Sequence, residues 1–174
     1  MADPSPSSMA DEERHPALTP VSGFLRAWSG RDASAFAAVC DPGLHYEDPL
    51  TLAPLRGPAE LGDHAARLWE AFPDVTVEAV GEPTAGARAV AVPCRVEGTH
   101  GAALAGLPAT GRRVAVHGVF WVEPAGDGRL LRVRAFFDLY DAGVQLGLLP
   151  SRGGLGERAL LVLRGFGLRV RERS

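Results

Sequence analysis

The stretch EAFPDVTVEAV, residues 70–80, decides the fold class, because the pattern of hydrophobic residues changes within it. Upstream of Pro73, hydrophobic residues recur every three or four positions, as at Leu61, Ala65 and Leu68, and this spacing predicts an amphipathic helix. Downstream of Pro73 they alternate with polar residues, and a period of two predicts strands. We therefore expect helices before this point and most of the sheet after it.

Two helices are predicted near the start of the chain. Thr19 followed by Pro20 is a typical N-cap and first helical residue, and hydrophobic residues follow at helical spacing as far as Trp28. Asp32 is expected to cap a second, shorter helix that ends near Cys40.

One strand and a third helix are predicted next. Asp41-Pro42-Gly43 is typical of a turn. LHYEDP, residues 44–49, is then expected to form a short strand closed by Pro49. Pro58 occupies a favoured first position for the third helix, which ends at Pro73.

Four further strands follow, separated by turn-forming segments. Three helices first and hairpins after favour an α+β fold, in which the helices cover one face of a curved antiparallel sheet, over alternating βαβ units. Such an arrangement is expected to enclose a hydrophobic pocket between the helices and the sheet. The strands are predicted at residues 75–80, 88–100, 112–122 and 129–138.

Composition excludes several classes of protein. The chain has 174 residues, of which 46% are hydrophobic, and is expected to form one domain at residues 18–150, after a disordered leader at 1–17 and before a helical tail at 151–174. A net charge of −3 offers no basic surface to nucleic acid. No hydrophobic run reaches the roughly 20 residues that span a bilayer, so membrane contact is not expected. Two cysteines and no metal-binding spacing indicate a cytoplasmic protein without a metal site.

The tail has an unusual pattern. Its hydrophobic residues point to all sides of a helical wheel, with arginines between them. A helix of this kind is usually buried, so we expect the tail to pack on the chain's own sheet or on a dimer partner. A basic helix on a membrane surface is the alternative, although Gly165 and Gly167 weaken any helix there.

Five segments carry a resemblance to a known family. They are HYEDP (45–49), LRGPAEL (55–61), EAFPD (70–74), GTHGAALAGLPATGR (98–112) and FFDLYDAGVQLGLLP (136–150). Through them, residues 20–150 resemble the NTF2-like superfamily and, within it, the SnoaL-like polyketide cyclases. The resemblance implies a cone-shaped α+β fold with a deep hydrophobic pocket, and it implies a homodimer.

The resemblance also marks positions where related enzymes hold catalytic groups. The acid/base aspartate of the cyclases lies ten residues before the Gln of QLG, where this chain has Ala135, and their histidine corresponds to Phe120. Limonene-epoxide hydrolases also have their aspartate at the position of Ala135. Ketosteroid isomerases use the aspartate of EDP as base, which matches Asp48, but their two hydrogen-bond donors correspond to Phe24 and Phe120. A close copy of any of these mechanisms is therefore not expected.

Asp48 is the leading candidate for catalysis. Alternation along the strand places Leu44, Tyr46 and Asp48 on one face. If this face lines the pocket, its hydrophobic surroundings would raise the pKa of Asp48 and suit it to remove a proton next to a carbonyl group. The alternative is that Asp48 only accepts backbone N–H bonds at the Asp-Pro turn.

Four other polar residues are further candidates. His64 falls on the buried stripe of the third helix, and His100 lies at the root of the glycine-rich loop. Each is either a catalytic acid or a structural residue, His64 in the core and His100 as a brace of the hairpin. Tyr46 offers a hydroxyl that could replace a lost donor. Asp138 could replace the missing acid only if a bulge turned it inward.

The expected function follows from these candidates. We expect a cyclase-like or isomerase-like enzyme that acts on a hydrophobic carbonyl compound by acid/base chemistry, with no metal or organic cofactor, since proton transfer needs none. The alternative is a protein that binds a small hydrophobic molecule without turning it over. The absence of the carboxylates that the related enzymes use favours this alternative. In either case the expected pocket wall includes Phe24, Trp28, Trp69, Phe120, Ala135 and Phe137.

Overall fold

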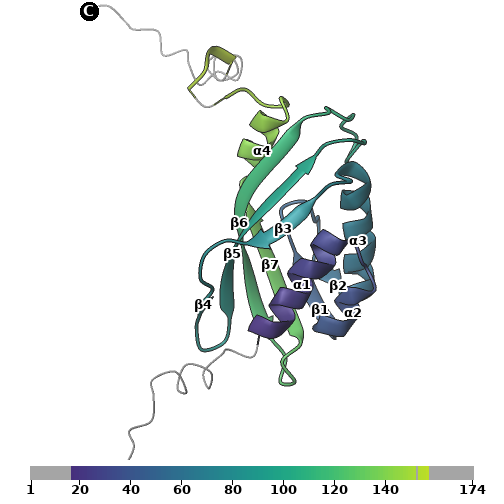
Figure 1. Cartoon of the computed structure of the whole chain (residues 1–174), viewed down its shortest axis with the longest axis vertical. Coiled ribbons are helices and arrows are strands. Elements are labelled where there is room, and N and C mark those ends of the chain that lie inside the picture. Colours follow the sequence, from purple (N-terminus) through teal and green to yellow (C-terminus); the bar gives the residue numbers. More distant parts are fainter. Residues whose placement is uncertain (1–16, 152, 157–174) are drawn as a thin grey trace, which may run out of the picture.

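The computed structural model describes residues 17–151 and 153–156, which contain four helices and seven strands (Figure 1). The helices are α1 (Leu18–Gly30), α2 (Ala35–Val39), α3 (Gly57–Ala71) and α4 (Leu139–Gln145). The strands are β1 (Cys40–Glu47), β2 (Leu55–Arg56), β3 (Thr76–Ala79), β4 (Thr84–Ala85), β5 (Val90–Thr99), β6 (Arg113–Pro124) and β7 (Leu130–Phe137).

The seven strands form one curved sheet that does not close, and α1, α2 and α3 lie together on one side of it (Figure 1). The strand order is β2-β1-β7-β6-β5-β3, with β4 also paired to β5. The predicted meander is confirmed as β3, β5, β6 and β7, paired antiparallel in sequence order. One pair departs from this pattern, because β1 runs parallel to β7. The long connection through α3 and the meander makes that parallel pairing possible. The α+β fold class is thus confirmed.

Helix α1 has the buried face that its hydrophobic spacing predicts, with Phe24 and Trp28 both in the core. Its start differs from the prediction. The helix begins at Leu18 with Ala17 at the N-cap, so the hydroxyl of Thr19 lies inside the first turn and does not cap the helix. Burial of the hydrophobic face therefore fixes this helix without the expected cap.

Helix α2 is short and is held by a carboxylate and an aromatic ring. Asp32, which was predicted to cap this helix, lies two residues before the N-cap residue Ser34, and its Oδ1 accepts the backbone N–H groups of Ser34 and Ala35 at 3.0 and 3.3 Å. Phe36 is fully buried, with its ring centroid 5.5 Å from that of Phe24 on α1. Aromatic packing of this kind adds to the stabilisation from burial alone.

Strand β1 begins earlier than predicted. Asp41-Pro42-Gly43 does not form a separate turn, because it lies inside β1 as an irregularity where the register against β7 shifts between Cys40 and His45. Beyond this point the predicted alternation holds, since Leu44 and Tyr46 are buried on the face toward the helices.

Helix α3 places a histidine against the face of β1 that carries Tyr46. Pro58 lies in its first turn, as predicted, and its buried face contains Leu61, His64 and Ala65. The helix packs against β1, so His64 faces the strand that carries Tyr46.

Helix α4 lies against β6 and was not predicted. The side-chain oxygen of Gln145 accepts the backbone N–H of Ala115 at 2.8 Å, and its nitrogen donates to the Ala115 carbonyl at 2.9 Å. The two hydrogen bonds engage the N–H and C=O of Ala115 as a neighbouring strand would, and they fix the helix to the end of the sheet.

Two predictions fall outside the described residues: the leader, apart from Ala17, and the arginine-rich part of the tail. Within the described ranges, no helix is long and hydrophobic enough to cross a membrane. Cys40 and Cys94 are buried and form no disulfide. Burial raises the pKa of each thiol to about 12, which makes both unsuitable as nucleophiles at neutral pH.

Candidate functional site

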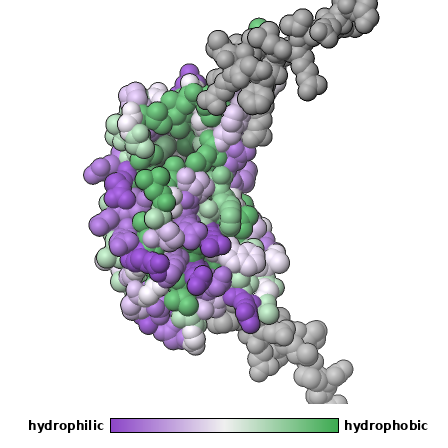
Figure 2. All heavy atoms as spheres, turned by 180° about the vertical axis from the view of Figure 1, so that it is seen from behind, coloured by the Kyte–Doolittle hydropathy of each residue, from purple (hydrophilic) through white to green (hydrophobic). Residues whose placement is uncertain are grey.

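A cavity of about 140 Å³ lies between the sheet, α3 and α4. Engineered cavities of roughly 150 Å³ accommodate benzene, so this one has room for a small ring system. Figure 2 shows hydrophobic residues around a hollow in the upper half of the molecule. The described residues that line the cavity are Trp28, Tyr46, Asp48, Pro49, Leu50, Leu68, Phe72, Val75, Val77, Val96, Glu97, Gly98, Val114, Val116, Phe120, Phe137, Leu139, Ala142 and Leu146.

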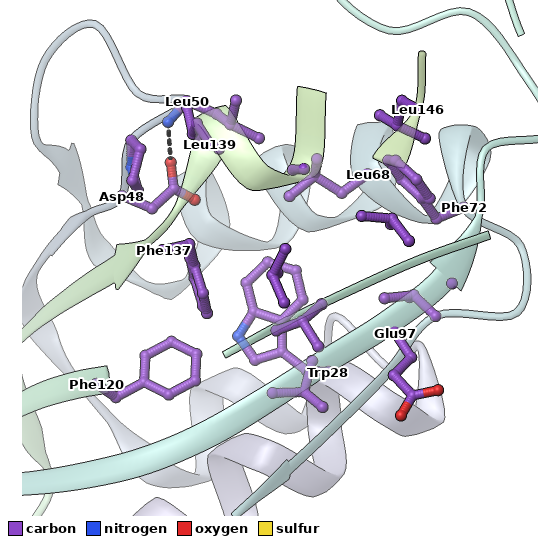
Figure 3. Close-up of a pocket in the computed structure, with 18 of the residues that line it drawn as sticks. Trp28, Asp48, Leu50, Leu68, Phe72, Glu97, Phe120, Phe137, Leu139 and Leu146 are labelled. Atoms are coloured by element: carbon purple, nitrogen blue, oxygen red, sulfur yellow. Dashed lines mark hydrogen bonds between the residues drawn. The ribbon is translucent and has the colours of Figure 1, made fainter. Parts of the chain in front are cut away.

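Two carboxylates belong to this lining, but only one of them is directed inward. Glu97 forms ion pairs with Arg95 at 2.7 Å and with Arg113 at 2.5 Å, both on the outer face of the sheet. In Figure 3 its carboxylate lies on the opposite side of the cavity from Asp48 and points away from the other side chains. Among the described lining residues, Asp48 is therefore the acid whose carboxylate is not paired with arginines.

Asp48, Tyr46 and His64 form a hydrogen-bonded group at one end of the cavity. Nε2 of His64 lies 2.7 Å from Oδ2 of Asp48, and the hydroxyl of Tyr46 donates to the same oxygen at 3.0 Å. The His64 and Asp48 side chains are 7% and 5% exposed, and Tyr46 is buried. The group forms because Tyr46 and Asp48 share one face of the β1 segment, while His64 lies on the buried face of α3 that packs against it.

The geometry shows the turn-capping role that the sequence left open for Asp48. Its Oδ1 accepts the backbone N–H of Leu50 at 2.8 Å (Figure 3). The Thr51 hydroxyl closes the same turn by donating to the Asp48 carbonyl at 2.9 Å. One carboxylate oxygen therefore caps the turn after β1, while the other meets Tyr46 and His64.

The expectation that Asp48 has a raised pKa is wrong. Burial raises the pKa of Asp48, but the hydrogen bond and charge of His64, the N–H of Leu50 and the hydroxyl of Tyr46 together lower it below its ordinary value. Asp48 is thus ionised at neutral pH.

Tyr46 stays protonated at neutral pH. Burial first, and then the charge and hydrogen bond of Asp48, raise the pKa of Tyr46 well above its ordinary value. Its single hydroxyl proton is donated to Asp48. In this arrangement Tyr46 therefore does not supply the ligand with the replacement donor that we expected.

His100 lies in the loop between β5 and β6, and it is not among the described residues that line the cavity. Its ring is buried and stacks on Phe72, with the centroids 5.1 Å apart. The backbone N–H of Thr110 donates to His100 Nδ1 at 3.3 Å, across the loop. These contacts brace the hairpin and do not bring His100 together with Asp48 and His64.

The aromatic residues divide between the cavity and the core. Phe24, Trp69 and Ala135 are not in the described lining. Phe24 and Ala135 are buried in the core, and Trp69 stacks on Phe36 with a centroid distance of 6.3 Å. The expected wall residues that do line the cavity are Trp28, Tyr46, Phe120 and Phe137.

Asp138 has a structural contact. It is the N-cap of α4, where its Oδ1 accepts the backbone N–H of Asp141 at 2.9 Å. It is not among the described lining residues, and no bulge is seen between Phe137 and its partner Gly118 on β6.

One wall of the cavity was not predicted from the sequence. Leu139, Ala142 and Leu146 line it from the side of α4. Their spacing of three and then four residues, directly after the N-cap residue Asp138, is a helical signal that the sequence contains. That signal was available but short, since α4 has only seven residues.

The fold of this chain is similar to that of several solved structures. Similar solved structures include TsrD from Streptomyces laurentii, with 20% identity, a TM-score of 0.68 and coverage of 79% of this chain and 98% of TsrD. A SnoaL-like protein from Jannaschia sp. CCS1 has 23% identity, a TM-score of 0.65 and coverage of 80% and 99%. A Catenulispora acidiphila protein with a ketosteroid isomerase-like fold has 18% identity, a TM-score of 0.63 and coverage of 76% and 95%. At these identities the likeness shows a shared fold.

The family itself is shown by sequence. No curated protein matches the chain. The family described as SnoaL-like polyketide cyclase, however, matches residues 21–146, which run from the first turn of α1 to the first residue after α4 and include the Tyr46–Asp48–His64 group. The chain belongs to the SnoaL-like polyketide cyclase family.

Proposed function

We propose that the cavity binds a small hydrophobic carbonyl compound and that Asp48 moves a proton next to its carbonyl group. The position of Asp48 carries this proposal. Its carboxylate is 5% exposed, belongs to the wall of a hydrophobic cavity, and is hydrogen-bonded by the side chains of His64 and Tyr46. A titratable group held in this way in a pocket is a typical arrangement for acid/base chemistry.

The proposed step needs no cofactor. The ionised Asp48 accepts a proton from the carbon next to the carbonyl group, the electron pair of the broken C–H bond moves toward the carbonyl oxygen, and an enolate forms. The enolate then either regains the proton at another position or attacks a second carbonyl group of the same molecule and closes a ring. The membership of a family described as polyketide cyclases supports the second course.

The lowered pKa of Asp48 restricts the reaction. A carboxylate that is hydrogen-bonded by His64, Tyr46 and Leu50 is a weaker base than a free aspartate, so it holds the transferred proton only briefly. This property suits an isomerisation or a ring closure, in which the proton is passed back within one catalytic cycle. His64, which is not in the described lining, acts as a positioning residue for Asp48.

Binding without turnover is the second candidate, and a specific observation favours it. Ala135 and Phe120 are apolar at positions where the related enzymes hold catalytic groups. The lowered pKa also makes Asp48 a weaker base. In this case Asp48 would orient a ligand and close the turn after β1, without exchanging a proton.

Deuterium exchange separates the two candidates. We suggest 2-indanone as the probe, since it is a small hydrophobic ketone with exchangeable CH₂ groups on both sides of its carbonyl. The protein and the probe are mixed in D₂O, and the loss of the CH₂ proton signals is followed by NMR. The proposal expects the protein to accelerate this exchange and the Asp48→Asn variant to lose about 100-fold or more of the acceleration, the usual contribution of a general base.

Glu97→Gln is the matched control, because it neutralises an acid in the lining whose carboxylate pairs with arginines outside the cavity. This variant is expected to keep the wild-type exchange rate. If 2-indanone binds and its exchange is not accelerated, binding without turnover is the better account. If 2-indanone does not bind at all, both candidates fail for hydrophobic ketones.

A further inference from the structure

Trp28 carries a buried hydrogen-bond donor that has no partner. The residue is 5% exposed and lines the cavity, and within residues 17–151 and 153–156 its Nε1 forms no hydrogen bond. The contrast with Trp69 is informative, because Nε1 of Trp69 donates to the Trp28 carbonyl at 3.0 Å. A buried N–H without a partner is unusual in proteins and is destabilising, so a ligand that accepts its hydrogen bond is favoured.

The other polar groups of the cavity are already engaged. The hydroxyl of Tyr46 donates to Asp48, and Asp48 is an acceptor while it is ionised. Glu97 pairs with Arg95 and Arg113 on the outside. Among the side chains of the described lining, Nε1–H of Trp28 is therefore the donor that remains for a carbonyl oxygen.

Tyr46 lies between the indole and the proposed base in a chain of contacts. The ring of Trp28 lies beside that of Tyr46, with centroids 6.4 Å apart, and Tyr46 is in turn hydrogen-bonded to Asp48. Figure 3 shows the indole nitrogen on the side of the ring turned toward Phe120 and Phe137. Because Nε1 is buried, a ligand has to displace a neighbouring side chain to reach it, and Phe137 is only partly buried.

We propose that Nε1–H of Trp28 donates a hydrogen bond to the carbonyl oxygen of the ligand, and so orients the neighbouring carbon toward Asp48. This inference rests on the proposed function, because it requires a carbonyl compound in the cavity. The same donor stabilises the negative charge that develops on that oxygen when the proton leaves. It would take the place of donors that the related isomerases have at positions where this chain has Phe24 and Phe120.

Two ligands of nearly the same shape test the hydrogen bond. 2-Indanone has a carbonyl oxygen, whereas 2-methyleneindane has a CH₂ group in its place and accepts no hydrogen bond. The affinity of each is measured by calorimetry for the wild type and for Trp28→Phe, which removes the N–H and keeps an aromatic ring. We expect the variant to bind 2-indanone about 3- to 10-fold more weakly, as for the loss of one hydrogen bond, and to keep its affinity for 2-methyleneindane within about twofold.

Trp121→Phe is the matched control, because Trp121 is 43% exposed on β6, is outside the described lining and undergoes the same chemical change. It is expected to bind both probes like the wild type. If Trp28→Phe loses affinity for both probes equally, or for neither of them, the hydrogen bond is overturned, while hydrophobic binding in the cavity still stands. If the wild type binds neither probe, the proposed function fails, and the inference fails with it.

A second measurement uses the unmodified side chain and remains valid if Trp28→Phe does not fold. In ¹H–¹⁵N spectra, the chain gives three indole N–H signals, since it has three tryptophans. We expect 2-indanone to move the Trp28 signal downfield and 2-methyleneindane not to do so. The Trp69 signal is an internal reference, because its N–H already has a partner. Identical shifts of the Trp28 signal with both probes would overturn the hydrogen bond.

Discussion

His64 on α3 and Asp48 at the end of β1 are joined by a contact of 2.7 Å between Nε2 and Oδ2. The two residues are 16 positions apart in the chain, and both side chains are almost completely buried. The contact ties the helical layer to the sheet at the edge of the cavity. It also sets the charge state of the carboxylate on which the proposed function depends.

His64→Leu should test this contact most simply. The substitution keeps a hydrophobic residue on the buried face of α3 but removes the strongest partner of a buried carboxylate, so we expect the free energy of unfolding to fall by about 1–3 kcal/mol. Denaturation by urea measures this loss. His117→Leu is the control, because His117 is exposed on β6 and the same change there should leave stability nearly unchanged. Equal losses in the two variants would contradict a special role for the His64–Asp48 contact.

Asp48 should make the stability of the protein depend on pH in a defined direction. Its pKa in the folded protein is below the ordinary value of 3.8, so the ionised form favours folding. This contribution is fully present above about pH 4 and is lost as the pH falls through the lowered pKa. The free energy of unfolding of the wild type should therefore exceed that of Asp48→Asn at pH 7, and the difference should shrink below pH 4. A difference that grows on acidification would show that the pKa of Asp48 is raised.

Tyr46→Phe isolates the third member of the group. The phenol is fully buried and its hydroxyl donates to an ionised carboxylate, so its loss should destabilise the protein by about 1.5–3 kcal/mol, the range for hydrogen bonds to charged groups. Thermal or urea unfolding measures this difference. Tyr140→Phe provides the comparison, because that hydroxyl donates to the neutral carbonyl of Pro150, and about 1 kcal/mol is expected there. If Tyr46→Phe lowers the free energy of unfolding by less than Tyr140→Phe does, the Tyr46 hydrogen bond does not stabilise the group.

Gln145→Ala should loosen the wall of the cavity that α4 provides. The Gln145 side chain makes two hydrogen bonds to the backbone of Ala115, and the variant leaves both backbone groups without that partner. We expect faster hydrogen exchange of the Ala115 amide and weaker binding of 2-indanone, while the exchange of amides in α3 stays unchanged. Unchanged protection of Ala115 would mean that α4 is held by its hydrophobic contacts alone.

The sequence was most informative where one periodic pattern filled a whole element. The change of period at Pro73 predicted the order of helices and strands, and the alternation along β1 predicted that Tyr46 and Asp48 share a face. Short or irregular elements were harder to predict from the sequence. Asp41-Pro42-Gly43 has the composition of a turn, yet it lies inside β1, between Cys40 and His45, which both pair with β7. The seven residues of α4 were too few to stand out.

The electrostatics of the site depend on contacts that periodicity does not reveal. The pKa of Asp48 was expected to rise because its surroundings are hydrophobic, and burial does act in that direction. The opposite result arises because His64, Tyr46 and the N–H of Leu50 meet at one carboxylate from a helix, a strand and a turn. The unpaired N–H of Trp28 likewise depends on the packing of several elements around one ring.

The proposed function requires Asp48 to be an ionised carboxylate that is held by His64 and placed against the ligand. A ¹³C NMR pH titration of the Asp48 carboxyl carbon, with and without saturating 2-indanone, tests this requirement, with Glu97 as the internal reference. We predict that Asp48 titrates below an ordinary aspartate in the free protein, and that 2-indanone moves its signal and raises its pKa by excluding water, while the Glu97 titration is unchanged. An Asp48 that titrates at or above the ordinary value, or that does not respond to bound 2-indanone, would show that His64 does not hold an ionised Asp48 against the ligand.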